Sequence, residues 1–158
     1  MLWHWDYSGD GISASGTFTT SSVAQPAGGY LITAITGTRN GDAIVRLEPA
    51  GSSIPGNEPY LLDNLVFRGA GPQLTSHGFG FATAHGSYSN PFYADFLPTP
   101  GYLEFFSTPP DHSEPPISFS AVPVAAPEPS PAGLLLMAAL LLLGVWIMWR
   151  RGFLRWAR

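Results

Sequence analysis

The amino-acid sequence predicts an all-β protein, with an antiparallel β-sandwich or barrel-like ectodomain followed by a Pro-rich spacer and one C-terminal transmembrane helix. Three observations lead to this class. Short apolar runs before residue 131 alternate with a period of two, turns rich in Gly, Pro and Asn separate them, and an uncharged apolar run follows. We therefore expect a β-rich domain at 1–107, a last strand and spacer at 108–131, a transmembrane helix at 132–149 and an arginine-rich tail at 150–158.

The β-rich domain contains one strand that is clearer than the others. Ile12, Ala14, Gly16 and Phe18 alternate with hydroxyl residues, which places one face toward a core and the other toward solvent. Further strands are expected at 30–36, 43–47, 61–67, 78–84, 102–107 and 117–122. Turns are expected at 28–29, 40–42, 55–57, 69–72, 89–91 and 98–101. Such short strands, at intervals of roughly 10 to 20 residues, are typical of an antiparallel sandwich or barrel.

The C-terminal segment predicts a membrane anchor. Residues 108–131 carry eight prolines, so the second half of this stretch is expected to be an extended spacer. The run from 132 to 149 carries no charge and, at about 1.5 Å per residue, is long enough to cross a hydrocarbon core of about 30 Å. The arginines that follow it are Arg150, Arg151, Arg155 and Arg158. Such a cluster favours the cytoplasmic side, which places the β-rich body outside the cytoplasm.

A short motif, Pro127, Glu128 and Pro129, precedes this apolar run and the arginines. In that order, the three parts resemble the PEP-CTERM sorting signal of Gram-negative bacteria, so the chain is similar to PEP-CTERM sorting domain-containing proteins. The resemblance implies export, brief retention by the helix, and processing near residues 127–129 by an exosortase, a membrane-embedded cysteine transpeptidase. It also implies a final place at the cell surface or in an extracellular matrix. The expected partners are therefore the membrane, an exosortase and the exopolysaccharide of a biofilm.

The first residues do not supply an export signal. Residues 1–6 lack a basic n-region, an apolar h-region and a small-residue cleavage site. We expect that the true leader is missing from this sequence, and that the body enters the periplasm from the inner membrane before it reaches the surface. The alternative is a tail-anchored protein with a cytoplasmic body, against which the tail arginines argue.

Charge and composition exclude several classes of function. Up to residue 131 the chain has three arginines, no lysine and all eleven acidic residues, which gives a formal charge of −8. Nucleic-acid binding is not expected, because it requires clustered Lys or Arg to neutralise phosphates. The absence of cysteine excludes disulfides, thiol catalysis and thiolate metal sites. No cofactor is expected.

No catalytic residue is assigned, and a non-enzymatic protein is expected. The G-x-S-x-G elbow that often marks a serine hydrolase is missing. The four histidines show no pair at the close spacing of a metal site, and surface or turn positions are expected for them: His4, His77, His85 and His112. Asp63, Asp95 and Glu104 cannot be placed as a glycosidase pair from sequence. A secreted hydrolase is the less favoured alternative.

Two weak binding signals remain. Asp6, Asp10 and Asp42 lie in or beside turns and offer oxygen ligands for calcium, but they do not match an EF-hand loop, and Asx-turn capping is the favoured explanation. Six aromatic residues offer rings for sugar stacking or for a core: Trp3, Trp5, Tyr88, Phe92, Tyr93 and Tyr102. The sequence thus favours an exported, non-enzymatic surface or matrix protein, with a carbohydrate-binding module of an exopolysaccharide matrix as the alternative.

Overall fold

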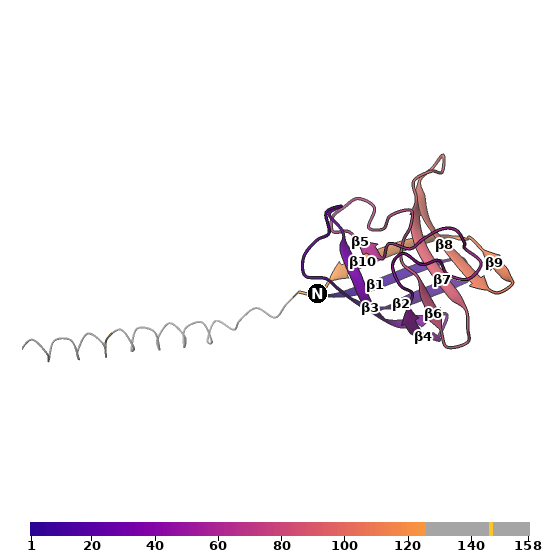
Figure 1. Cartoon of the computed structure of the whole chain (residues 1–158), viewed down its shortest axis with the longest axis horizontal. Coiled ribbons are helices and arrows are strands. Elements are labelled where there is room, and N and C mark those ends of the chain that lie inside the picture. The colour runs from indigo at the N-terminus through magenta and orange to yellow at the C-terminus, as the bar shows by residue number, and fades with distance from the viewer. Residues whose placement is uncertain (126–145, 147–158) are drawn as a thin grey trace, which may run out of the picture. The chain divides into compact units, whose positions relative to one another are not determined.

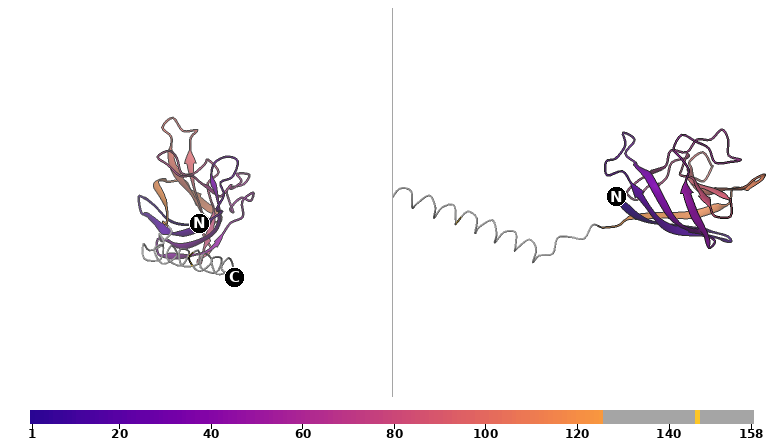
Figure 2. Two further views of the ribbon diagram at one scale, coloured as in Figure 1. Left: turned by 90° about the vertical axis from the view of Figure 1, so that its left-hand side faces the viewer. Right: turned by 60° about the horizontal axis from the view of Figure 1, so that its bottom comes forward.

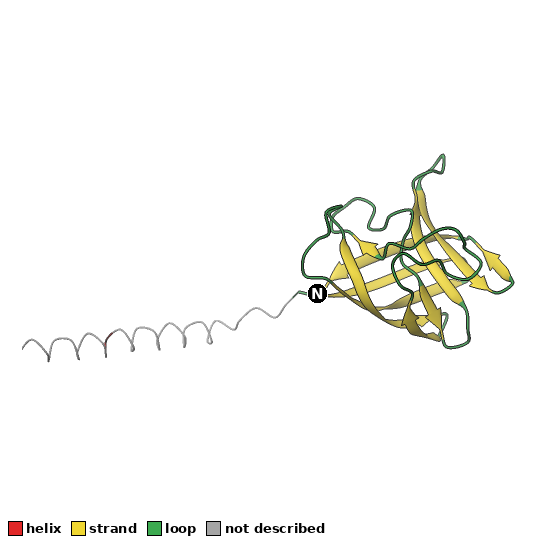
Figure 3. Cartoon of the chain, viewed as in Figure 1, coloured by secondary structure: helices red, strands yellow, loops and turns green. Residues whose placement is uncertain are grey.

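The structure is a computed structural model that describes residues 1–125 and Trp146. Residues 1–125 contain ten strands and no helix, with antiparallel pairing throughout, so the all-β prediction is confirmed (Figure 3). The strands are β1 (Leu2–Gly9), β2 (Ile12–Thr20), β3 (Tyr30–Arg39), β4 (Asp42–Leu47), β5 (Leu65–Val66), β6 (Phe81–Thr83), β7 (Tyr88–Ala94), β8 (Gly101–Thr108), β9 (Asp111–Ser113) and β10 (Pro116–Pro123).

Eight of these strands close into a barrel. Their order is β10, β1, β2, β3, β4, β6, β7 and β8, and a pairing of β10 with β8 joins the two ends. That closing contact covers only Pro116 with Leu103 and Ile117 with Tyr102. The two remaining strands are attached at the side, β5 to β3 and β9 to β8 (Figures 1 and 2). The barrel alternative of the sequence prediction is therefore the correct one.

The first strand supplies the centre of the core, although the sequence reading did not predict it. Trp3, Trp5 and Tyr7 are buried, and the residues between them are exposed, as the two-residue period of a strand requires. β1 pairs with β2 on one side and with β10 on the other. Trp5 packs against Phe18 of β2 at 6.5 Å and against Phe79 at 6.0 Å between ring centroids. Close-packed rings of this kind fill the interior of the barrel.

Two local predictions are wrong, and each has a physical reason. Residues 89–91, expected as a turn, lie inside β7. The Pro91 carbonyl points away from β8 and accepts a hydrogen bond from the Phe79 N–H at 3.3 Å. On that side the pairing of β6 with β7 ends at Ser89, before Pro91 is reached. The missing proline N–H therefore removes no ladder bond. The strand expected at 61–67 is limited to the two residues of β5. β9 is an additional strand that was not predicted.

The residues before β5 instead form an ordered loop outside the barrel. The loop runs from Glu48 to Asn64, whose side-chain amide donates to the Glu48 carbonyl at 2.8 Å and so joins the two ends. Ile54 and Leu62 point back from it and are buried against the outer face of β7 and β8. This second core contains Ile54, Leu62, Phe92, Ala94 and Phe105. Loops that carry their own small core are ordered although they lack regular structure.

The barrel is one compact unit, from Met1 to Val124. Among the residues that the structure describes, no helix is long and apolar enough for a membrane span. The sorting motif at 127–129, the transmembrane helix expected at 132–149 and the tail arginines fall outside the described residues, apart from Trp146.

Candidate functional site

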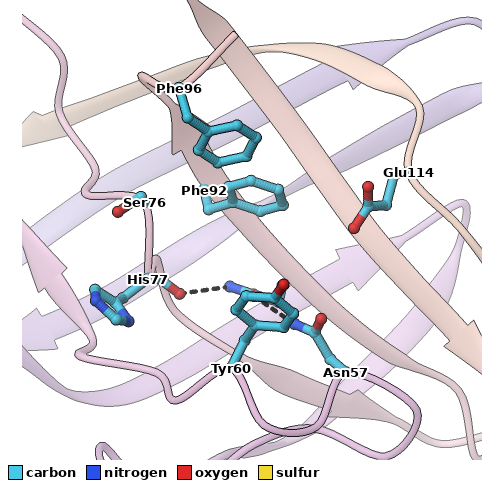
Figure 4. A pocket seen from close by; sticks show the side chains of 8 residues that line it. Asn57, Tyr60, Ser76, His77, Phe92, Phe96 and Glu114 are labelled. Atoms are coloured by element: carbon cyan, nitrogen blue, oxygen red, sulfur yellow. Dashed lines mark hydrogen bonds between the residues drawn. The ribbon is translucent and has the colours of Figure 1, made fainter.

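A pocket of about 430 Å³ opens on the outer face of β7, beside the loop that ends at Asn64. Eight residues line it: Asn57, Tyr60, Ser76, His77, Asn90, Phe92, Phe96 and Glu114. Figure 4 shows the rings of Phe96, Phe92 and Tyr60 one above another, with His77 on one side of the view and Glu114 on the other. Its volume falls in the range of about 300–1,000 Å³ that is usual for small-molecule sites.

The pocket is assembled from segments far apart in the sequence. Asn57 and Tyr60 come from the outer loop, and Phe92 comes from β7. Phe96 lies in the β7–β8 connection, which projects from the barrel in Figure 1. Glu114 lies between β9 and β10. The second core holds the outer loop, and with it Asn57 and Tyr60, against β7.

Two of the rings are displayed to solvent. Tyr60 is 70% exposed and Phe96 is 68% exposed, whereas Phe92 at 7% forms the floor. The backbone around Tyr60 is fixed: its N–H donates to the Asn57 carbonyl (2.9 Å), and its carbonyl accepts from Ser53 Oγ (2.7 Å). Large apolar rings at the rim of a pocket are informative, since most such rings in a domain this size are buried.

A chain of amides fixes the polar wall. Asn90 Nδ2 donates to the carbonyls of His77 and Phe79, each at 3.1 Å. Asn90 Oδ1 must therefore be an acceptor, and it accepts from Asn57 Nδ2 at 3.2 Å (Figure 4). Asn57 Oδ1 takes no hydrogen bond from the described residues, so it remains as an acceptor on the wall of the pocket.

His77 and Glu114 complete the lining. His77 Nδ1 lies 2.7 Å from the Leu61 carbonyl. Since a carbonyl can only accept, Nδ1 carries the proton, and Nε2 of the neutral ring is an acceptor. Glu114 is exposed and forms no ion pair with any described residue. It is the only acid among the eight lining residues. A glycosidase requires two carboxylates across the scissile bond, and this pocket offers one.

The sequence candidates for sugar stacking are mostly elsewhere. Trp3 and Trp5 are buried in the barrel core. Tyr93 and Tyr102 pack against each other, with ring centroids 5.1 Å apart. Only Phe92 lines this pocket, while Tyr60 and Phe96 were not considered. Their signal was available, because both stand in Pro-rich connections outside any strand period.

A second pocket of about 420 Å³ lies beside the first and shares Ser76 with it. Its wall includes Phe67, Leu74, Tyr93 and Asp95. It is shallow and lacks exposed rings, because Tyr93 and Leu74 pack into the main core. The first pocket is therefore the stronger candidate for ligand binding.

A buried polar cluster inside the barrel holds two opposite walls together. Arg39 of β3 meets Glu104 of β8 in a two-pronged ion pair, with Nε–Oε1 at 2.7 Å and Nη2–Oε2 at 2.8 Å. Tyr7 donates to Glu104 Oε1 at 2.5 Å, and Ser89 donates to the same oxygen. The Arg39 guanidinium also lies 3.6 Å from the centre of the Phe106 ring. Glu104 is fully buried, so it is not available as half of a catalytic pair.

Burial and charge shift the pKa values in this cluster. Burial raises the pKa of Tyr7 well above its ordinary value, and the charge of Glu104 raises it further. Burial alone would lower the pKa of Arg39, but its hydrogen bond to Glu104 and the charge of that carboxylate raise it instead. Both groups therefore keep their protons at neutral pH, and the cluster links β1, β3, β7 and β8 across the interior of the barrel.

The calcium candidates are dispersed. Asp6 is exposed on β1, Asp10 is exposed in the β1–β2 turn, and Asp42 contacts His85 Nδ1 at 2.6 Å. A hydrogen bond from Thr83, together with His85, lowers the pKa of Asp42. No group of three or more His, Asp or Glu side chains among the described residues is arranged to hold a metal ion.

The histidines lie at the surface. His4, His77, His85 and His112 are all exposed, as the sequence reading expected. His77 and His85 have different partners, the Leu61 carbonyl and Asp42.

The chain matches no protein-family model, no curated protein and no solved structure.

Proposed function

We propose that this chain is an exported, non-enzymatic surface or extracellular-matrix protein, delivered by its C-terminal segment and released by processing near residues 127–129. The observation that carries the proposal is the order of three features at the C-terminus. The Pro127–Glu128–Pro129 triplet comes first, the uncharged run at 132–149 follows, and the arginines end the chain. Such an order provides a recognition motif, a temporary anchor and a cytoplasmic stop.

The barrel is compatible with release from a C-terminal membrane anchor. Its unit ends at Val124, three residues before the triplet, and the core clusters of the described residues lie within that unit. Cleavage near residue 127 would therefore remove none of the strands. The barrel also keeps its stability without disulfides, since the chain has no cysteine.

The hydrolase alternative receives less support. Glu114 stands as a single acid in the pocket, and Glu104 is engaged with Arg39 in the interior. Metal-assisted hydrolysis needs a cluster of ligands that the described residues do not offer, and paired-carboxylate hydrolysis needs a second acid that does not line this pocket. Display of the barrel, with binding at its pocket, is the function that remains best supported.

The experiment is fractionation of the protein, fused behind a cleavable export leader so that translocation does not depend on residues 1–6, in a Gram-negative host that carries an exosortase. An epitope tag is placed between Val23 and Ala24, in an exposed loop. We expect a tagged product shorter than the full chain in the surface or medium fraction. Replacement of Pro127, Glu128 and Pro129 by alanine should leave a full-length product in the membrane fraction. Pro131→Ala, in the same stretch but outside the triplet, is the matched control and should behave as the wild type.

Two results would contradict the proposal. One is a full-length wild-type protein confined to the cytoplasm. The other is equal processing of the wild type and the triple-alanine variant, which would show that the triplet is not recognised.

A further inference from the structure

We infer that the pocket between the outer loop and the β7–β8 connection binds an uncharged sugar residue of a glycan. Tyr60 and Phe96 stack on the apolar face of the sugar ring, and Asn57 Oδ1 and Glu114 accept hydrogen bonds from its hydroxyls. This inference deepens the proposed function and rests on it in one respect, because export is what brings the barrel to an extracellular glycan. Binding itself is a property of the barrel and can be measured apart from export.

The exposed rings indicate the apolar part of the ligand. Tyr60 and Phe96 lie two-thirds or more exposed at the rim, with Phe92 below them. A sugar ring presents C–H groups on its faces and hydroxyls around its edge, so flat aromatic rings complement the faces. Tyr60 is carried on a turn whose backbone is hydrogen-bonded, so little ordering entropy is lost when a ligand covers it.

The polar groups of the wall indicate the other part of the ligand. Asn57 Oδ1, the Glu114 carboxylate and His77 Nε2 are acceptors without partners among the described residues. Acceptors without a donor partner on the pocket wall, such as Asn57 Oδ1 and the Glu114 carboxylate, match a ligand rich in O–H donors. A purely apolar ligand would cover these groups without giving them a hydrogen-bond partner, which disfavours its binding.

The charge of the site indicates that the sugar is uncharged. Among the residues that the structure describes, no arginine lines the pocket, and the three arginines of residues 1–125 are engaged elsewhere. Arg39 pairs with Glu104, Arg46 pairs with Glu48, and Arg68 lies over the rings of Trp3 and Tyr30. The carboxylate of a uronic acid would meet Glu114 with no cation to compensate it. A neutral sugar is therefore favoured over an acidic one.

The test is affinity electrophoresis of the full chain, purified in mild detergent. Native gels contain dextran, hydroxyethyl cellulose or galactomannan as neutral probes, and polygalacturonate as the acidic probe. We expect retardation by at least one neutral probe and none by polygalacturonate. Tyr60→Ala and Phe96→Ala should each weaken binding about three- to tenfold, the size of one lost stacking contact. Glu114→Gln should allow polygalacturonate to bind.

Val23→Ala is the matched control, because Val23 is an equally exposed apolar side chain on a different loop. Its binding should equal that of the wild type. Thermal midpoints of all variants should stay near the wild-type value, since none of the changed side chains is buried. Retardation by no neutral probe, binding that survives both ring substitutions, or equal retardation by polygalacturonate would overturn the inference. A processed, exported protein with any of these results would refute this inference alone and leave the delivery proposal intact.

Discussion

Replacing Glu104 by glutamine should remove a large part of the stability of the barrel. The carboxylate accepts four hydrogen bonds, from Tyr7, Ser89 and the two prongs of Arg39, and its side chain is fully buried. In either orientation of a glutamine amide, its NH₂ group faces at least one of these donors. Arg39, whose side chain is only 10% exposed, would keep its charge without a counter-ion. Breaking such a buried pair costs about 3–5 kcal/mol, and we expect the lower end because Arg39 retains some contact with solvent and the Phe106 ring.

Urea unfolding of the full chain in mild detergent, followed by tryptophan fluorescence, measures this effect. A loss of about 3 kcal/mol corresponds to a drop of roughly 10 °C in Tm for a domain of this size. The double variant Arg39→Met with Glu104→Leu should be more stable than Glu104→Gln, because no unpaired charge remains and Tyr7 and Ser89 can bond each other across 2.9 Å. Arg46→Gln, which breaks the pair between an exposed arginine and the nearly buried Glu48, is the comparison and should cost less than Glu104→Gln, because the Arg46 side chain is 59% exposed. A cost below about 1 kcal/mol for Glu104→Gln, or a double variant less stable than the single one, would refute the reasoning.

Three further predictions concern the core and the turn that supports the pocket. In urea unfolding, Trp3→Phe should lower the free energy of unfolding by about 1 kcal/mol more than Trp5→Phe does. The Trp3 indole N–H donates a hydrogen bond to Thr20 Oγ1 at 3.0 Å, whereas the Trp5 N–H is buried without a partner among the described residues. The free energy of unfolding should fall as pH rises above about 10, because the pKa of Tyr7 is raised in the folded state and the unfolded chain loses that proton first. Tyr7→Phe should reduce the slope of this free energy against pH by up to about 1.4 kcal/mol per pH unit. Gly78→Ala should cost about 1–3 kcal/mol more than Gly86→Ala, because both glycines have positive φ but only at Gly78 would a new Cβ meet a backbone oxygen, at 2.1 Å.

The strands were predictable wherever one face is buried and the other exposed. Ile12 to Phe18 alternate with hydroxyl residues, and this stretch lies in β2, which extends to Thr20. The turn at 40–42 was equally readable, because Asn40 and Gly41 adopt the positive φ that such a hairpin requires. β1 carries the same alternation in Trp3, Trp5 and Tyr7. Residues 1–6 stand where an export leader is sought, and Trp3 and Trp5 also fit the pattern of candidate binding rings, so the strand was missed.

The site could not be predicted from the sequence, because it depends on contacts between distant segments. Arg39 and Glu104 are 65 positions apart, and only closure of the barrel brings them together. The pocket needs the loop from Glu48 to Asn64 to fold onto β7, which is decided by the burial of Ile54 and Leu62 and not by any local period. Pro91, which suggested a turn, lies in β7 because the pairing of β7 with the neighbouring strand β6 ends before this residue.

The most direct test of the delivery account is intact-mass analysis of the mature protein isolated from its native host. We predict a C-terminus near residues 127–129, with the apolar run and the four tail arginines removed and all strands through β10 retained. A mature protein that still ends at Arg158 would contradict it.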